Sequence, residues 1–337
     1  MSEYENSNSL LASRVYREVG SSGNSLVTIA IGEKYLHNWE ENSLKHWLHY
    51  CEKWDMGLIC IVSNLVDKSS KFWKKATWQK LLIPNHLKAT YPNVKRACYL
   101  DTDILISPIA EDIFEEVPPG KIGLVSLYHS LPYNRKDTLD RIAYLRNLTS
   151  GGMYPIDSAL FISLENIYRY HQLSPKDNLA CMGLIVFDVD DPKIHLFERY
   201  FESYTSSVTS ITDGGDQTHL NFHIQSDFEV YWLEYKWQAI WLYEAANKYP
   251  AAFWTETYES YLQDISSSLM SNFFLHFAGA WPESQIWKKV ALLEKNQVFM
   301  SLPGLLASRK VKKTGVPKGT IKFLSGSRID NEDGADK

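Results

Sequence analysis

The sequence has few cysteines, no long apolar run and no excess of positive charge. Its four cysteines, at positions 51, 60, 98 and 181, form no Cys-x-x-Cys pair and have apolar neighbours. We therefore expect buried free thiols rather than disulfides or a zinc site, which fits a reducing cytoplasm best. The longest apolar stretch, Leu179 to Phe187, is far shorter than the roughly 20 residues of a membrane span. Because the N-terminus is polar and acidic, we predict neither a signal peptide nor a membrane span.

The charge balance excludes a protein that coats nucleic acid. Thirty-five Lys and Arg oppose forty Asp and Glu, so the net charge of the 337 residues is −5. Any anionic ligand must therefore be held by a local group. Hydrophobic residues make up 45% of the chain and aromatic residues 13%, which is enough material for a large folded core.

Both ends of the chain differ in composition from the middle. Residues 1–23 are rich in Ser, Asn and Glu and are interpreted as a polar extension, whereas residues 306–337 form a polar, partly basic tail. The basic positions of the tail could hold a partner or contact an anionic membrane surface peripherally, although a solvated tail is the simpler interpretation. One domain is expected over residues 24–305.

Between these ends, patterns typical of strands and helices alternate. Strands are predicted at 26–31, 57–62, 97–100, 122–127 and 182–187, and helices over 38–54, over 71–89 and from about residue 192. Strands that are apolar throughout and separated by helices indicate an α/β fold, with a mainly parallel central sheet and helices on both faces. Ligands of such folds bind beyond the carboxyl ends of the strands.

Three groups of polar residues follow predicted strands. Asp101 and Asp103 interrupt an apolar run at a strand end, where they are either held by hydrogen bonds or hold a hard divalent cation. His276 lies in a short apolar strand, as a structural residue or as a third ligand of a manganese site. Asp216 and Gln217 follow two glycines where a helix begins, so that capping alone would explain Asp216.

Taken in order, these segments resemble a GT-A fold glycosyltransferase. The segments are VTIAIG from residue 27, YLDTDILI at 99–106, GLIVFD at 183–188, GGDQTHLN at 214–221 and LHFAG at 275–279. Their spacing is closest to retaining enzymes of glycosyltransferase family 8, which includes glycogenin and lipopolysaccharide galactosyltransferases. The resemblance covers about residues 26–295 and implies transfer of a hexose from a nucleoside diphosphate sugar, with UDP the expected nucleotide. It also implies a saccharide or glycoconjugate acceptor.

The resemblance implies a role for each matching residue. Asp101, Asp103 and His276 match the ligands of a Mn²⁺ or Mg²⁺ ion that bridges the donor diphosphate and stabilises the leaving group. Asp216 and Gln217 match the catalytic pair beneath the anomeric carbon, where the glutamine of retaining members is debated as nucleophile or stabiliser. The residues expected to bind the nucleotide sugar are Ala30, Ile31, Gly32, Tyr35, Lys80, Thr102 and Gly279.

Three departures from the family pattern bear on donor identity. Cys181-Met182-Gly183 stands where the family usually reads Asn-Ala-Gly, so an asparagine contact to the donor sugar is missing. Thr218 replaces an acidic residue after the Asp-Gln pair. The sequence after HFAG lacks the family's Lys-Pro-Trp, and a lysine at position 288 or 289 could take the place of the missing one.

Two other interpretations stay open from the sequence. A sugar nucleotidyltransferase would carry a glycine-rich, basic loop after the first strand, where this chain has one glycine in IGEKYLHNW. A non-catalytic carbohydrate- or partner-binding protein on the same fold would be consistent with the three departures.

An inverting enzyme would need a general base, for which Asp157, Asp213 and Glu283 are candidates. Among the tryptophans that could stack on an acceptor sugar, Trp281 is favoured because it follows HFAG.

Overall fold

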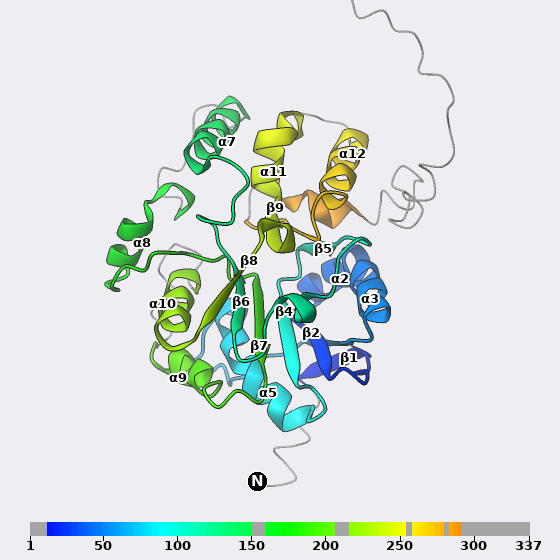
Figure 1. Ribbon diagram of the computed structural model, residues 1–337, viewed down its shortest axis with the longest axis vertical. Coiled ribbons are helices and arrows are strands. Elements are labelled where there is room, and N and C mark those ends of the chain that lie inside the picture. Colours follow the sequence, from blue (N-terminus) through cyan, green and yellow to red (C-terminus); the bar gives the residue numbers. More distant parts are fainter. Residues whose placement is uncertain (1–11, 150–158, 206–215, 254–257, 280–282, 291–337) are drawn as a thin grey trace, which may run out of the picture.

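A seven-stranded sheet runs through the centre of the molecule. The computed structural model describes residues 12–149, 159–205, 216–253, 258–279 and 283–290 (Figure 1). Within them the strands lie in the order β1-β3-β2-β4-β7-β6-β8. Their bounds are β1 Ser13–Arg17, β2 Asn24–Ile29, β3 Gly57–Ile61, β4 Arg96–Leu100, β6 Ile122–Val125, β7 Leu184–Asp188 and β8 Val230–Leu233.

Five of these strands point in one direction. β2 is parallel to both β3 and β4, and β6 is parallel to β8. β7 is antiparallel to both β4 and β6, so β6 and β8 share the direction of β4, while β1 runs antiparallel to β3. The expected α/β class and mainly parallel sheet are thus confirmed, with β7 reversed in the middle. The carboxyl ends of five strands and the amino end of β7 meet at one edge.

A second, three-stranded sheet lies beyond that edge. It has the order β5-β10-β9, with β5 at Ile104–Ile106, β10 at Phe274–His276 and β9 at Ala239–Ile240. β10 is antiparallel to β5 and parallel to β9. Figure 1 shows this sheet between the central sheet and the helices α11 and α12. Because only three residues separate β4 from β5, a tight turn joins the two sheets.

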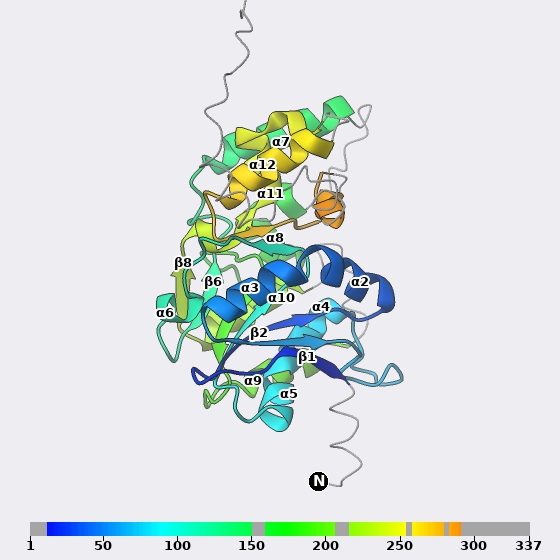
Figure 2. The ribbon, with the colours of Figure 1, turned by 90° about the vertical axis from the view of Figure 1, so that its right-hand side faces the viewer.

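The central strands are buried on both faces, and successive residues pack into different apolar clusters. Leu26 and Leu58 pack with α2 (Glu33–Asn42), α3 (Leu44–Lys53) and α6 (Ile113–Glu116). Their neighbours Val27 and Ile59 pack with α5 (Ile83–Thr90), α9 (Leu196–Glu202) and α10 (Gln217–Asp227). In Figure 2, α2 and α3 lie on one side of β1 and β2, and α5 and α9 on the other. The helices therefore cover both faces, as continuous apolar strands require.

A third apolar cluster supports the small sheet from above. It joins α7 (Arg135–Thr149), α11 (Trp241–Lys248) and α12 (Tyr258–Leu269) to both residues of β9 and to one residue each of β5 and β10. The short helices α4 (Ala76–Gln79) and α8 (Leu164–Tyr170) complete the α-helices of the described residues. Single turns of 3-10 helix occur at Lys80–Leu82, Ala159–Phe161, Tyr235–Gln238, Pro250–Phe253 and Gln285–Lys289.

The structure places a strand within residues 1–23, the segment predicted to be a polar extension. This strand, β1, pairs with β3, with Ser13 opposite Ile61 and Arg17 opposite Leu58. It is an edge strand, and Val15 is 38% exposed. Edge strands carry charged residues that keep other chains from pairing with them, so their composition resembles that of a solvated segment. The predicted tail at 306–337 lies outside the described residues.

Both long helices predicted near the N-terminus are divided. The pattern over 38–54 belongs to two helices, α2 and α3, which meet at Ser43, whose hydroxyl donates to the Thr102 carbonyl (3.0 Å). The segment 71–89 contains α4, a 3-10 turn and α5. Pro84 lies in the first turn of α5, the position where a helix tolerates the missing N–H of proline.

The cysteine prediction is confirmed, because all four cysteines are free and buried.

Trp237 and Trp241 are also fully buried and belong to the core, while Trp281 lies outside the described residues. None of the helices in the described residues has the length and apolar composition needed to cross a bilayer. A cytoplasmic location stays a prediction.

Candidate functional site

Asp101 and Asp103 lie in the turn between β4 and β5, at the edge where the strands end. The Asp101 N–H donates to the Gly183 carbonyl (2.9 Å), and the Asp101 carbonyl accepts from the Ile104 N–H (3.2 Å). The Asp103 carbonyl accepts from the Phe277 N–H (3.0 Å). Backbone bonds to β7 and to the end of β10 therefore fix both carboxylates, and the turn is not a free loop.

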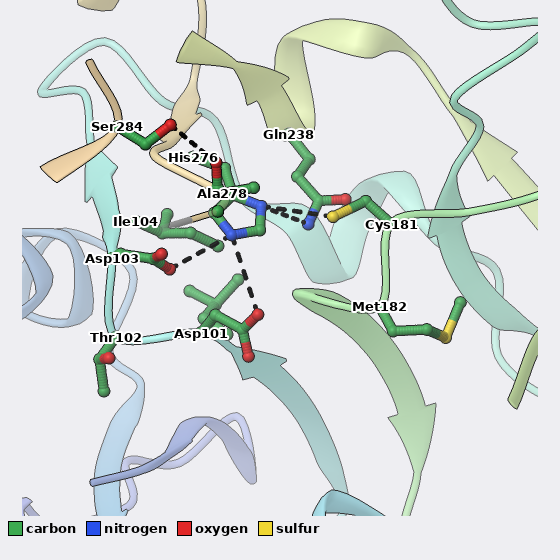
Figure 3. A network of polar contacts seen from close by, with 12 residues as sticks. Asp101, Thr102, Asp103, Ile104, Cys181, Met182, Gln238, His276, Ala278 and Ser284 are labelled. Atoms are coloured by element: carbon green, nitrogen blue, oxygen red, sulfur yellow. Dashed lines mark hydrogen bonds and ion pairs between the residues drawn. The ribbon is translucent and has the colours of Figure 1, made fainter. Parts of the chain in front are cut away.

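His276, the last residue of β10, faces the two carboxylates. Its Nε2 atom is 3.2 Å from Asp103 Oδ1 and 3.8 Å from Asp101 Oδ2. One donor atom from each of the three residues lies within 4.8 Å of the others. Figure 3 shows both carboxylates on one side of the imidazole. The structure thus brings together three residues that the sequence predicts as metal ligands.

The opposite side of the imidazole contacts residues that the sequence does not predict. Gln238 and Cys181 lie beside Nδ1 (Figure 3), with the Gln238 amide at 3.1 Å and the Cys181 sulfur at 3.5 Å. The amide orientation that satisfies every neighbour places Oε1 toward Nδ1 and toward the Leu184 N–H (3.0 Å). Its Nε2 then donates to the Cys181 carbonyl (3.1 Å).

Gly183 leaves the space that this arrangement needs. A Cβ atom at this position would lie 2.3 Å from His276 Cε1, 2.8 Å from Asp101 Oδ2 and 3.0 Å from the Gln238 amide. The first two contacts are shorter than real Cβ atoms make and the third is tight, so any side chain would displace the imidazole or the Asp101 carboxylate. The glycine was visible in the sequence, but its role depends on contacts with residues far along the chain.

The donor atoms of this cluster suit a hard or borderline divalent cation. Two carboxylate oxygens and an imidazole nitrogen are ligands that Mn²⁺ accepts, and Mg²⁺ also prefers carboxylates. The side chains of Asp101 and Asp103 are 31% and 23% exposed, whereas that of His276 is 2% exposed. A cation could therefore reach the carboxylates from solvent while His276 holds it from the protein interior.

A buried ion pair adjoins the cluster. Lys80 Nζ lies 2.9 Å from Asp216 Oδ2 and 3.8 Å from Asp101 Oδ1, and it donates to the Met182 carbonyl (2.8 Å). The Tyr99 hydroxyl donates to the same oxygen, Asp101 Oδ1 (2.5 Å). Lys80 thus connects the turn after β4 with the start of α10, which brings Asp216 beside the predicted metal ligands.

Burial controls the charge of Asp216. Removal from water raises its pKa to about 6, although the Lys80 ammonium opposes this rise. Gln217 is the first residue of α10 and is partly exposed at the same corner. The two glycines that precede this pair in the sequence lie outside the described residues.

The predicted nucleotide-binding segment lies at the adjacent strand end. β2 pairs with β4, and the Thr28 hydroxyl donates to the Leu100 carbonyl (2.7 Å), so Ala30 follows β2 close to Asp101. Ala30 is buried and Ile31 is partly buried. Gly32 begins α2 with a φ of 100°, a conformation that favours glycine.

The other residues predicted to bind the nucleotide sugar are Tyr35, Thr102 and Gly279. Tyr35 is 64% exposed on α2, so its ring is available to a ligand or to solvent. Thr102 stands between the two carboxylates, with its carbonyl bonded to Ser43. Gly279 follows β10 with a φ of 99°, and its carbonyl accepts from the Gln285 amide (2.8 Å).

Of the three candidate general bases, one is described, and it is already paired. Glu283 is buried and forms an ion pair with Arg146 of α7 at 2.8 Å. Asp157 and Asp213 lie outside the described residues. Through this ion pair, Glu283 links the segment after β10 to α7.

No protein family and no curated protein matches this sequence. Among solved structures, a glycosyltransferase involved in glycosylation of the major capsid of PBCV-1 aligns with 79% of this chain and 98% of its own, at 8% identity and a TM-score of 0.45. The bifunctional glycosyltransferase WbbM aligns with 84% of this chain at 12% identity and a TM-score of 0.45. The glycosyltransferase GlyE of Streptococcus pneumoniae TIGR4 aligns with 86% at 12% identity and a TM-score of 0.41. The match spans 53% of the WbbM chain and 64% of the GlyE chain.

A Gly183→Ala variant tests the space beside His276. We expect at least about a tenfold loss of Mn²⁺ affinity by titration calorimetry, because the added methyl group separates the imidazole from the carboxylates. Gly120→Ala is the control, because a Cβ there meets open space although its φ of 78° is also strained for alanine. Equal losses of Mn²⁺ affinity in both variants would contradict the assigned role of Gly183.

An Asp216→Asn variant tests the burial of this carboxylate through stability. Because the folded pKa of about 6 exceeds the ordinary aspartate value of 3.8, protonation favours the folded state. That contribution is fully present below about pH 4 and is lost as the pH rises through about 6. From about pH 4.5 to about pH 7.5, the unfolding free energy of the variant should therefore rise by about 2 kcal/mol relative to the wild type.

Urea unfolding at both pH values measures this change. Asp190→Asn is the control, since that carboxylate is 59% exposed beside Lys95. A pH-independent difference between Asp216→Asn and the wild type would show that the Asp216 carboxylate is ionised without cost.

Proposed function

We propose that this protein is a metal-dependent glycosyltransferase of the GT-A type. It transfers a hexose from a nucleoside diphosphate sugar, with UDP the expected nucleotide, to an acceptor hydroxyl of a saccharide or glycoconjugate. The observation that carries the proposal is the arrangement of Asp101, Asp103 and His276 at the edge where five parallel strands end. This edge is where α/β folds bind nucleotides. Because the protein has a net charge of −5, a bound cation is the simplest group to hold the negatively charged diphosphate.

In this proposal the three residues hold Mn²⁺ or Mg²⁺. Bound there, the cation supplies positive charge to the donor diphosphate and to the departing nucleoside diphosphate. His276 contributes a buried, oriented nitrogen, and the partly exposed carboxylates open the site to the donor. Thr102 and the Ala30–Gly32 segment are placed beside this corner to contact ribose and base, and Tyr35 is exposed for stacking.

Lys80 and Asp216 hold the sugar end of the site in this proposal. The ammonium lies between Asp216 and Asp101, so one cation positions two carboxylates on different segments. The same pairing directs the Asp216 carboxylate at Lys80. Gln217, next to Asp216, can present an uncharged amide to the developing positive charge on the sugar.

We further infer that transfer proceeds with retention at the anomeric carbon. An inverting enzyme deprotonates the acceptor with a positioned base. The one described candidate base, Glu283, is paired with Arg146. The Asp216 carboxylate, next to Gln217, is paired with Lys80. These pairings favour retention, with Gln217 on the reacting side of the sugar.

Turnover of a panel of UDP- and GDP-hexoses tests the proposal. With Mn²⁺ present, we expect slow hydrolysis of at least one donor, loss of hydrolysis with EDTA, and recovery on adding Mn²⁺. Asp103→Asn removes one charged ligand and should lower kcat/KM by at least about a hundredfold, equivalent to about 3 kcal/mol. Asp190→Asn, at an exposed ion pair, should keep wild-type turnover. Absence of turnover across the panel, or turnover unaffected by chelation, would contradict the proposal.

The configuration of the transferred sugar tests retention. Proton NMR of the earliest product should show the anomer of the donor, and Gln217→Ala should lower kcat while leaving the Mn²⁺ affinity within about twofold, because the amide contacts the sugar and not the ion. An inverted product would overturn retention without affecting the metal site.

A further inference from the structure

We propose that Gln238 is the positioning residue for His276: its side-chain amide holds the imidazole with the Nε2 atom directed at Asp101 and Asp103. The inference rests on the proposed metal site, to which it adds a residue that no sequence motif indicates. Gln238 does not touch the carboxylates. It acts through His276 alone.

Gln238 occupies a rigid place in the fold. It is the last residue of the 3-10 turn Tyr235–Gln238 and directly precedes β9. β9 pairs in parallel with β10, with Ile240 opposite His276, so the turn before β9 lies beside the imidazole. The side chain is buried, with the residue 1% exposed. Because packing and strand pairing fix its backbone, the amide has little freedom to follow a moving imidazole.

The neighbours of the amide determine which of its two ends meets the imidazole. The Leu184 N–H requires an acceptor, and the Cys181 carbonyl requires a donor. Only one orientation serves both, and it places the amide oxygen 3.1 Å from His276 Nδ1. Both of these backbone groups flank Gly183, so the same segment that makes room for the imidazole also orients Gln238.

An oxygen at this position determines which imidazole nitrogen carries a proton. A neutral imidazole has one N–H and one lone pair, so an Nδ1–H that donates to Gln238 leaves the Nε2 lone pair free for a cation. The Nε2 atom is the one that faces Asp103 at 3.2 Å. Metal-binding histidines generally need such a partner on the second nitrogen, and its loss typically weakens metal binding 10- to 100-fold.

The Cys181 thiol is the competing partner of Nδ1. Its sulfur is 3.5 Å away, and sulfur is a weaker acceptor than an amide oxygen. If the thiol positioned the imidazole, Cys181→Ala would weaken metal binding and a change at Gln238 would not. Separate single variants of Gln238 and Cys181 therefore show which residue positions the imidazole.

Mn²⁺ titration of single variants tests the inference. Gln238→Met keeps a long side chain without an oxygen and should weaken Mn²⁺ binding about 10- to 100-fold. Gln238→Glu keeps an oxygen acceptor for Nδ1 but removes the donor to the Cys181 carbonyl, so it should bind Mn²⁺ more tightly than Gln238→Met without reaching the wild-type affinity, which a purely structural role would not explain. Cys181→Ala should stay within about threefold of the wild type. Wild-type affinity in Gln238→Met, or a loss only in Cys181→Ala, would overturn the inference.

A measurement on the metal-free protein separates this inference from the proposed function. Long-range ¹H–¹⁵N correlation spectra report whether Nδ1 of His276 carries a proton, and His276→Gln identifies its signals. We expect an Nδ1 proton that exchanges slowly with water in the wild type, because Gln238 accepts its hydrogen bond, and faster exchange of this proton in Gln238→Met. An unprotonated Nδ1 in the wild type would overturn the role of Gln238 even if Mn²⁺ binds. A protonated Nδ1 with no Mn²⁺ binding would support the role and refute the metal site.

Discussion

The site depends on a short contact between two backbones, where β4 ends against the entrance to β7. There the Asp101 N–H donates to the Gly183 carbonyl, and the missing side chain of Gly183 allows the His276 ring to approach. Because β7 runs against β4, the chain enters β7 at the edge where β4 delivers its carboxylates. A strand parallel to β4 would leave the sheet at this edge, and the residues preceding it would lie at the opposite edge.

The interior of the site is densely charged, and the fold balances these charges in pairs. Lys80 and Asp216 are each at most 5% exposed, and unpaired charges at such depth would be strongly unfavourable. Lys80 is shared between Asp216 and Asp101. The carboxylates of Asp101 and Asp103 keep contact with water, so uncompensated negative charge remains only on the solvent side. This polarity favours entry of a cation from outside.

The sequence predicts well those features that depend on neighbouring residues of one segment. Apolar strands followed by Asp101 or Ala30 are local patterns, and the structure places them at one edge as the α/β topology requires. Gln238 could not be predicted, because it stands between Trp237 and Ala239 in no recognisable motif and gains its role from a residue 38 positions away. The break at Ser43 likewise follows from a bond to the distant Thr102 carbonyl. β1 could not be recognised from the sequence, because an edge strand and a solvated tail both face water and therefore both carry polar residues.

The ligating and positioning side chains come from segments that are widely separated along the chain, between Lys80 and His276. An unfolded chain has no such constellation, so a cation that binds the three ligands binds only the folded form. By mass action the folding equilibrium then shifts with the concentration of free cation. The protein's resistance to unfolding would therefore follow the metal supply of its surroundings as well as its own packing.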